Sequence, residues 1–223
     1  GVLMLLATAC LWLGRAPGCT RPAAWGAAAV AAVSVGVLTK LTMLWLAPLF
    51  GVVFLADVVR RLHGRFWWAF VPLGLASAGA FFGAYGVATG DPLYPVHGIE
   101  RHHNATHWSY VGADAATVLR RITYEPALSL LRDLPEIALM AAAALPLLAG
   151  RRSPPGTGIW WAHAAAVAGG FWFGSTSFAA YTPLPLIPRM LAPLGPALAV
   201  LAGVAVAAAP LPRTVLLRAL LTA

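Results

Sequence analysis

The sequence predicts an all-α fold: a polytopic membrane helix bundle with one larger loop outside the membrane. Of its 223 residues 60% are hydrophobic and only 10% are charged, and the mean hydropathy is +0.78. Ordinary soluble domains carry about 25% charged residues, so this excess of apolar surface needs lipid to cover it. The net charge of +8 does not indicate a nucleic-acid partner, because the basic residues stand in short clusters between apolar runs.

Seven apolar segments are predicted to span the membrane as one domain covering residues 1–223. Their ranges are 1–14, 24–39, 41–56, 66–89, 134–149, 158–174 and 190–209. The first is too short for about 30 Å of hydrocarbon at about 1.5 Å per residue. It also begins at Gly1 without an initiator Met or a basic leader. We therefore expect the chain to be an internal fragment of a longer protein.

Lys40 divides what would otherwise be one overlong apolar segment. A single helix would bury this lysine at a membrane depth where charge is costly, so we predict two short or tilted helices joined near Lys40. The next span is long enough to cross, and Trp67 and Trp68 at its start are expected at the membrane interface.

Residues 90–133 are the one substantial polar region and are predicted to form the outer loop. With seven crossings, the positive-inside rule places four basic clusters in the cytoplasm and makes Lys40, this loop and Arg189 face outward. The clusters are Arg15 with Arg21, Arg60 with Arg61 and Arg65, Arg151 with Arg152, and Arg213 with Arg218. The chain is therefore predicted to be a multi-pass protein among membrane lipids, and its expected location is the plasma membrane.

Lys40 and Arg189 are the two cations with a candidate chemical role. A lysine at a helix junction can meet a phosphate as a mobile point charge, and an arginine can bind one through two parallel hydrogen bonds. The prolines around Arg189 stiffen its approach to the last span. A simple interfacial anchor explains each cation equally well, so both interpretations stay open.

The segment TGDPLYPVHG, residues 89–98, leaves the membrane with a strong turn signal and then presents Tyr94 and His97. Asp91 suits a structural turn in which its carboxylate accepts backbone N–H groups. Recognition of an acceptor or a sugar by Asp91, Tyr94 or His97 is the alternative.

No metal site is predicted, although a divalent metal remains possible. His103 and His107 have the i, i+4 spacing of metal ligands on a helix, but the flanking residues favour irregular loop. No disulfide framework is predicted from Cys10 and Cys19. No phosphate-binding loop or dinucleotide fingerprint occurs, so no cofactor is expected.

Three segments together resemble a known family: GVLTKLTMLWLAPL at residues 36–49, TGDPLYPVHG, and PRMLAPLGPAL at residues 188–198. In that order and spacing they resemble the later portion of membrane glycosyltransferases of the GT-C type, such as protein mannosyltransferase and aminoarabinose transferase relatives. The resemblance implies transfer of a sugar from a polyprenyl-phosphate donor to a glycan, lipid or protein acceptor at the outer membrane face.

The same resemblance implies that Lys40 and Arg189 contact the lipid-linked phosphate, whose developing negative charge needs stabilisation. Met190 replaces the usual aromatic residue after the arginine. The family's general base lies in an outer loop upstream of this chain, so no catalytic residue is assigned and the fragment alone is expected to be inactive. The alternatives are a transporter or flippase for a lipid or amphiphile, and a scaffold whose basic residues only set topology.

Overall fold

Every regular element of the protein is a helix in the computed structural model, which describes residues 1–104, 109–149, 154–177 and 181–209. The all-α prediction is therefore confirmed for this part of the chain. The α-helices are α1 (Val2–Gly14), α2 (Pro22–Thr39), α3 (Ala47–Arg60), α4 (Gly64–Thr89), α5 (Tyr94–Asn104), α6 (Ala115–Thr123), α7 (Glu125–Asp133), α8 (Pro135–Ala144), α9 (Pro146–Ala149), α10 (Thr157–Phe173), α11 (Pro188–Leu191) and α12 (Leu194–Ala208). A 3₁₀ helix, η1 (Leu41–Leu46), joins α2 to α3.

Three helical stretches are long and apolar enough to cross a membrane. They are α2, the continuous stretch of η1 and α3 over Leu41–Arg60, and α4. The 18 residues of α2 extend over about 27 Å at the α-helical rise. Shorter apolar helices follow the other predicted spans, among them α1, α8 with α9, and α12. These helices indicate a membrane protein, and the count of seven spans stays a prediction.

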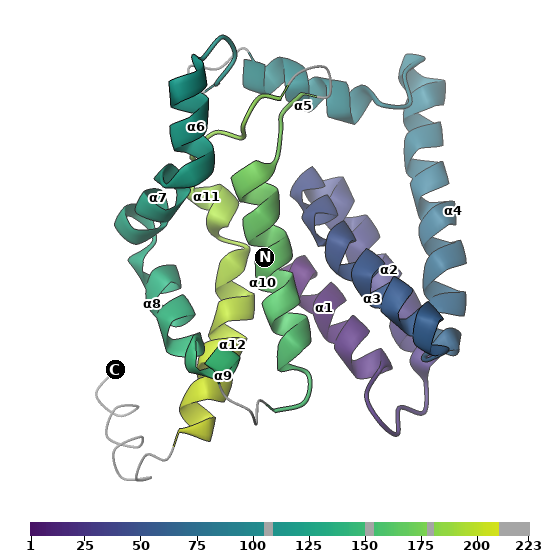
Figure 1. Ribbon diagram of the computed structural model, residues 1–223. Helices are drawn as coiled ribbons and strands as arrows, with labels where there is room; N and C mark the ends of the chain where they lie inside the picture. Colours follow the sequence, from purple (N-terminus) through teal and green to yellow (C-terminus); the bar gives the residue numbers. More distant parts are fainter. Residues whose placement is uncertain (105–108, 150–153, 178–180, 210–223) are drawn as a thin grey trace.

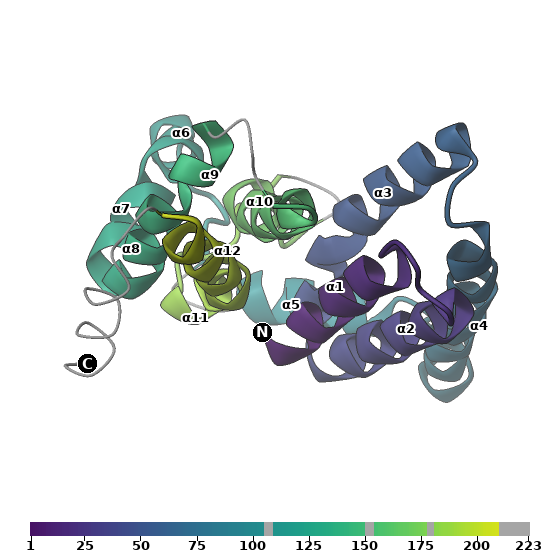
Figure 2. The same cartoon turned by 90° about the horizontal axis from the view of Figure 1, so that it is seen from below.

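The helices form two groups that meet at α10. On one side α1 packs against α2 and α2 against α4, and on the other α12 packs against α8 and α10. Seen from below, α10 stands between these groups (Figure 2). Its side of the core is formed by buried side chains of Trp160, Ala164, Val167 and Phe171, and by His163, which hydrogen-bonds Thr8 of α1 over 2.7 Å.

Close packing of α2 on α4 depends on a glycine and a pair of serines. A Cβ atom on Gly26 would lie 2.5 Å from the carbonyl oxygen of Phe66, so only glycine allows this approach. Further along both helices, the hydroxyls of Ser34 and Ser77 are 2.6 Å apart. Gly26 meets Phe66 and the later Ser34 meets the later Ser77, so α2 and α4 run in the same direction.

Most side chains of α4 are not fully buried in the protein. Only Phe66 and Trp67, in its first turn, are buried. Large apolar side chains farther along are open, with Leu75 70% and Val87 92% exposed. Exposed apolar surface of this extent marks a contact with lipid or with another protein. It agrees with a helix that faces the bilayer.

A buried polar cluster joins α1, α3 and α4 at the end of the molecule opposite α5 (Figure 1). Arg15 donates to both carboxylate oxygens of Asp57 over 2.7 and 2.8 Å, and the indole of Trp67 donates to the same carboxylate over 2.8 Å. Trp67 is 5% exposed in this cluster, whereas its neighbour Trp68 is 80% exposed. Their position at the membrane interface stays a prediction.

Residues 90–133 fold largely into the helices α5, α6 and α7. The prediction of irregular chain around His103 was wrong for residues 102–104, which form the last turn of α5. The carboxylate of Asp114 caps α6 by accepting the backbone N–H of Thr117 over 2.7 Å. From the end of α4, α5 crosses the top of the molecule toward α6 (Figure 1). Residues 105–108, which include His107, lie outside the described residues.

The predicted spans 134–149 and 190–209 are each interrupted near a proline. Leu145 separates α8 from α9, because Pro146 cannot donate the hydrogen bond that would continue the first helix. The last long helix, α12, begins only at Leu194, after the single turn of α11 and Pro193. Arg151, Arg152, Arg213 and Arg218 lie outside the described residues.

Candidate functional site

Lys40 and Arg189, which are far apart in the sequence, line the same cavity of about 380 Å³. Its walls come from the start of α1, the junction of α2 with η1, and the segment from α11 to Pro193. Gly36, Thr39 and Met43 contribute to the wall beside Lys40. The structure therefore brings together the two cations that the sequence indicated as phosphate contacts.

Lys40 stands at a break in the helix, as predicted. Its backbone is extended, with φ −164° and ψ 122°, and it ends α2. The break leaves local hydrogen bonds intact: the N–H of Lys40 donates to the carbonyl of Gly36 over 2.8 Å, and Met43 donates to the carbonyl of Lys40 over 3.1 Å. Two helical segments can thus meet at Lys40 without leaving its backbone N–H and carbonyl groups unpaired.

Arg189 is presented by the short helix α11. Pro188 occupies the first position, where a fixed φ suits a helix and no N–H is needed. The next two side chains, Met190 and Leu191, are buried at 6% and 2% exposure, whereas Arg189 is exposed. The turn is thereby fixed by its apolar residues, and the guanidinium is left available at the cavity.

The cavity carries positive charge without a visible counter-charge. None of its lining residues is Asp or Glu, and in the described ranges neither cation makes a hydrogen bond or ion pair through its side chain. Partial desolvation, and secondly repulsion from Arg189, lower the pKa of Lys40 from its ordinary value of 10.5. Two cations that line one cavity create a positive potential, which favours the binding of an anion there.

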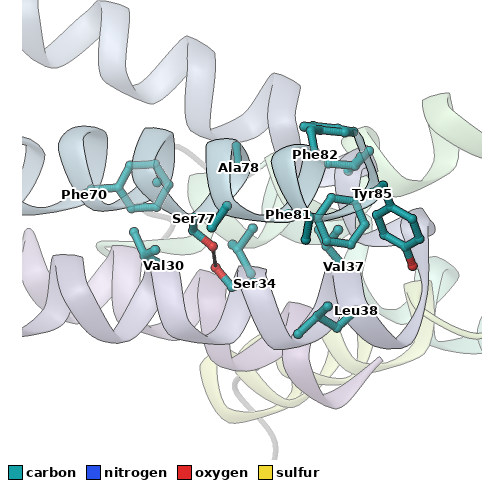
Figure 3. Close-up of a pocket in the computed structure, with 15 residues that line it drawn as sticks. Val30, Ser34, Val37, Leu38, Phe70, Ser77, Ala78, Phe81, Phe82 and Tyr85 are labelled. Carbon is teal, nitrogen blue, oxygen red and sulfur yellow. Dashed lines mark hydrogen bonds between the residues drawn. The ribbon is translucent and has the colours of Figure 1, made fainter. Parts of the chain in front are cut away.

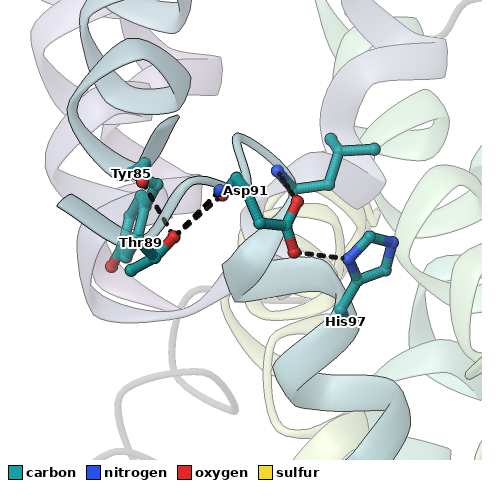
Figure 4. Close-up of polar contacts among 5 residues, drawn as sticks. Tyr85, Thr89, Asp91 and His97 are labelled. Carbon is teal, nitrogen blue, oxygen red and sulfur yellow. Dashed lines mark hydrogen bonds and ion pairs between the residues drawn. The ribbon is translucent and has the colours of Figure 1, made fainter. Parts of the chain in front are cut away.

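Asp91 and His97 meet at the turn between α4 and α5 (Figure 4), and Tyr94 is the first residue of α5. One oxygen of Asp91 accepts the N–H of Leu93 over 2.9 Å, and the other lies 2.7 Å from Nδ1 of His97. Mainly this contact with His97 lowers the pKa of Asp91. The ring of Tyr94 stacks on Tyr85 at 6.1 Å between centroids.

None of these three residues lines the cavity that holds Lys40 and Arg189. The described contacts of Asp91 lie within its own turn, which is the structural role that the sequence favoured. Tyr94 and His97 are exposed on the same surface. Their recognition of an acceptor or sugar stays a prediction.

An apolar groove of about 460 Å³ lies between α2 and α4 (Figure 3). Val30, Val37 and Leu38 line it from α2, and Phe81 and Tyr85 line it from α4. The hydrogen-bonded serines of these two helices meet across it (Figure 3). Leu38 and Leu44 belong to the groove while Thr39 and Met43 belong to the cavity, so the junction at Lys40 contributes to both hollows.

Comparison with known protein families, with curated proteins and with solved structures finds no match for this chain. The geometry described above is therefore the basis for assigning a function.

Sequence reasoning missed Arg121, which is completely buried on α6. Its guanidinium donates to the carbonyls of Phe171 and Leu184, each over 2.9 Å, and lies 4.9 Å from the ring centre of Phe171. The adjacent Arg120 is exposed. A double arginine on a short amphipathic helix gives no local signal of which side chain turns inward.

Residues for a metal site are not gathered in the part of the chain that the structure describes, where no group of three His, Cys, Asp or Glu side chains occurs. His107 and the side chain of His103 lie outside that part. The expectation of no resident metal stays a prediction.

Proposed function

We propose that this chain forms the donor-binding part of a multi-pass membrane glycosyltransferase that takes a sugar from a polyprenyl-phosphate carrier. The observation that supports this proposal most strongly is the shared cavity of Lys40 and Arg189, which has no carboxylate in its lining. The likeness of the surrounding segments to GT-C enzymes suggested the same two residues from sequence alone. The acceptor in this proposal is a glycan, a lipid or a protein.

A phosphate group suits this cavity for chemical reasons. Arginine offers a planar pair of N–H donors that matches two phosphate oxygens, and lysine adds a compact charge from another direction. When the sugar leaves its carrier, negative charge develops on the phosphate oxygen that stays behind. Two fixed cations at this position would stabilise that charge more strongly in the transition state than in the bound donor.

The groove between α2 and α4 supports a lipid-linked donor over a soluble one. Its lining is almost wholly apolar, with Ser34 and Ser77 bonded to each other. An amphiphile with an anionic head and a hydrocarbon chain would match the basic cavity and this groove together. In the proposal, the isoprenoid chain lies along α2 and its phosphate reaches Lys40.

The proposal includes seven crossings of the plasma membrane with the cavity toward the outer face. Arg15 caps the end of α1 and Arg61 the end of α3, whereas Lys40 caps the end of α2. The ends of α1 and α3 lie at the opposite end of the bundle from the end of α2 (Figure 1), which agrees with the positive-inside rule. Tyr94 and His97, on the outward surface of α5, would then face the incoming acceptor. No residue of this chain is assigned as general base, so donor binding is the appropriate test.

The test is titration of the detergent-purified chain with a short-chain polyprenyl monophosphate. Lys40→Ala and Arg189→Ala should each weaken binding by about tenfold to hundredfold, the value of one charged hydrogen bond. Arg132→Ala is the matched control, because this exposed arginine pairs with its neighbour Asp133 away from the cavity. It should bind as tightly as the parent.

Absence of binding to a folded parent, or equal affinity in all three variants, would contradict the proposal. Reconstitution separates it from the transporter alternative. Movement of a labelled polyprenyl phosphate between the leaflets of vesicles, dependent on Lys40, would favour a flippase. Binding without such movement would favour the transferase.

A further inference from the structure

Arg121 connects three parts of the chain through backbone carbonyls. Its Nε donates to Leu184 over 2.9 Å, one terminal nitrogen donates to Phe171 over 2.9 Å, and the other reaches Trp172 over 3.4 Å. In return, the indole of Trp172 donates to the carbonyl of Ile122 over 2.8 Å. The contact between α6 and the end of α10 is therefore reciprocal.

The chemistry of this site suits a fixed structural cation. The last carbonyls of a helix lack partners within it and carry partial negative charge, so a cation is favourable there. Phe171 and Trp172 belong to the last turn of α10. In the described residues, Arg121 makes no ion pair with a carboxylate. Its position therefore depends on these carbonyls and on the ring of Phe171.

The segment that Arg121 holds is also bonded to the chain just after α10. Leu184 donates to the carbonyl of Gly174 over 3.2 Å, and Thr176 donates to that of Thr182 over 2.8 Å. Pro183 is buried and forms an antiparallel bridge with Ser175. The carbonyl of Leu184 is consequently a fixed point relative to α10.

Only four residues separate Leu184 from Arg189, and two of them are prolines. Proline fixes φ near −65°, so Pro185 and Pro188 leave this connection little freedom. Ile187 is further tied by donating to the carbonyl of Pro185 over 2.9 Å. The position of Leu184 is thereby transmitted to α11 and to the guanidinium of Arg189.

We infer that Arg121 is a positioning residue for the anion cavity: through the carbonyl of Leu184 it holds Arg189 opposite Lys40. This inference rests on the proposed function, since the anion to be bound is the lipid phosphate. The placement of Arg189 relative to Lys40 can be measured without any ligand.

The first experiment measures geometry. Lys40→Cys and Arg189→Cys are combined in a chain whose Cys10 and Cys19 are replaced, and a short bis-maleimide reports whether the two positions face each other. With Arg121 intact the cross-link should form efficiently. With Arg121→Gln or Arg121→Lys it should fall several-fold, because neither side chain can reach the carbonyls of Leu184 and Phe171 with the same fork of donors.

The second experiment measures affinity for a short-chain polyprenyl monophosphate with Lys40 and Arg189 both present. Arg121→Lys should lose about tenfold, as expected when one charged hydrogen bond is misaligned. For Arg121→Ala, millimolar guanidinium should restore much of the affinity by filling the vacated position. Arg15→Gln is the matched control, since it removes an arginine that contacts buried Asp57 at the other end of the bundle. It should destabilise the fold and leave the affinity unchanged.

A lowered cross-link and a guanidinium-restored affinity would support the inference. Folded Arg121 variants that cross-link and bind like the parent would overturn it. So would equal affinity losses in Arg121→Lys and Arg15→Gln with an unchanged cross-link, because that result would indicate general destabilisation. If the cross-link falls but the folded parent binds no polyprenyl phosphate, the proposed function fails while Arg121 retains its geometric role.

Discussion

Arg15 and Asp57 form a two-point ion pair in which the carboxylate is almost entirely removed from solvent. The two N···O distances are 2.7 and 2.8 Å, and the side chains are 20% and 1% exposed. Removing one partner of such a pair leaves a buried charge without compensation. The pair therefore stabilises the contact between the ends of α1 and α3.

Arg15→Gln should lower the free energy of unfolding by about 3 kcal/mol, the usual range for breaking a buried pair. Unfolding of the detergent-solubilised protein by increasing SDS measures the change. Arg132→Gln is the control, because its pair with Asp133 is surface-exposed and such pairs contribute about 1 kcal/mol or less. Equal effects of the two substitutions would contradict the buried role of Asp57.

Gly26→Ala should destabilise the packing of α2 on α4. The added Cβ would lie 2.5 Å from the carbonyl oxygen of Phe66, which is backbone and cannot rotate away. Overpacking of this kind typically costs about 1–3 kcal/mol. Gly79→Ala on α4 is the matched control, since no atom lies within 4 Å of its added Cβ. Unfolding measurements should find the control equal to the parent or slightly more stable.

The turn at Asp91 should lose order in acid. Its pKa lies below the ordinary value of 3.8, so the stabilisation is fully present above pH 3.8 and is lost as pH falls through the lowered value. Hydrogen exchange at the N–H of Leu93, which donates to Asp91, reports this loss. Asp91→Asn keeps an acceptor oxygen and should remove the acid dependence, so a persistent transition in this variant would assign it to another group.

The affinity for polyprenyl monophosphate should begin to fall at a lower pH than it would if Lys40 had the ordinary pKa of a lysine. The pKa of Lys40 is lowered from 10.5, so the ammonium loses its charge, and the anion its contact, below that pH. Stability of the ligand-free protein has the opposite sign: it rises with pH across this window, because the unfolded state binds more protons there.

Titrations with polyprenyl monophosphate at several pH values measure this loss of affinity. Lys40→Arg should move the loss to higher pH, since arginine stays protonated. Arg189→Ala should also raise the pKa of Lys40 by removing the repulsion. Identical pH profiles for the parent and Lys40→Arg would exclude Lys40 as the titrating group.

The features that the sequence predicted well are those in which charge interrupts an apolar run. The position of Lys40 alone predicts that a helix ends there, because a charge in the middle of an overlong apolar segment is costly inside the membrane. Arg189 stands out for another reason, because the prolines around it stiffen the approach to the last span and fix where its guanidinium emerges. Both residues stand out against their neighbours, and the structure places them at one cavity.

The features that sequence reasoning missed depend on partners distant in the chain. Arg121 is buried because the end of α10 offers it free carbonyls, and nothing near it in the sequence shows that contact. The burial of Trp67 depends on another helix, α3, where the ring of Phe54 packs against it and Asp57 accepts its N–H group. The polar composition of residues 115–133 predicts a loop, whereas the structure forms the amphipathic helices α6 and α7 there, each only nine residues long.

The uneven burial of α4 and α10 has a consequence for tolerance to mutation. Beyond Trp67, α4 buries no side chain in the protein, whereas α10 places Trp160, Val167 and Phe171 in the core. Positions of α4 that lie outside the groove with α2, such as Leu75 and Val87, are therefore constrained chiefly by the requirement to be apolar and helical, and a library of apolar substitutions at them should leave many folded variants. The same library in α10 should leave few, because each change in volume is felt by the surrounding helices.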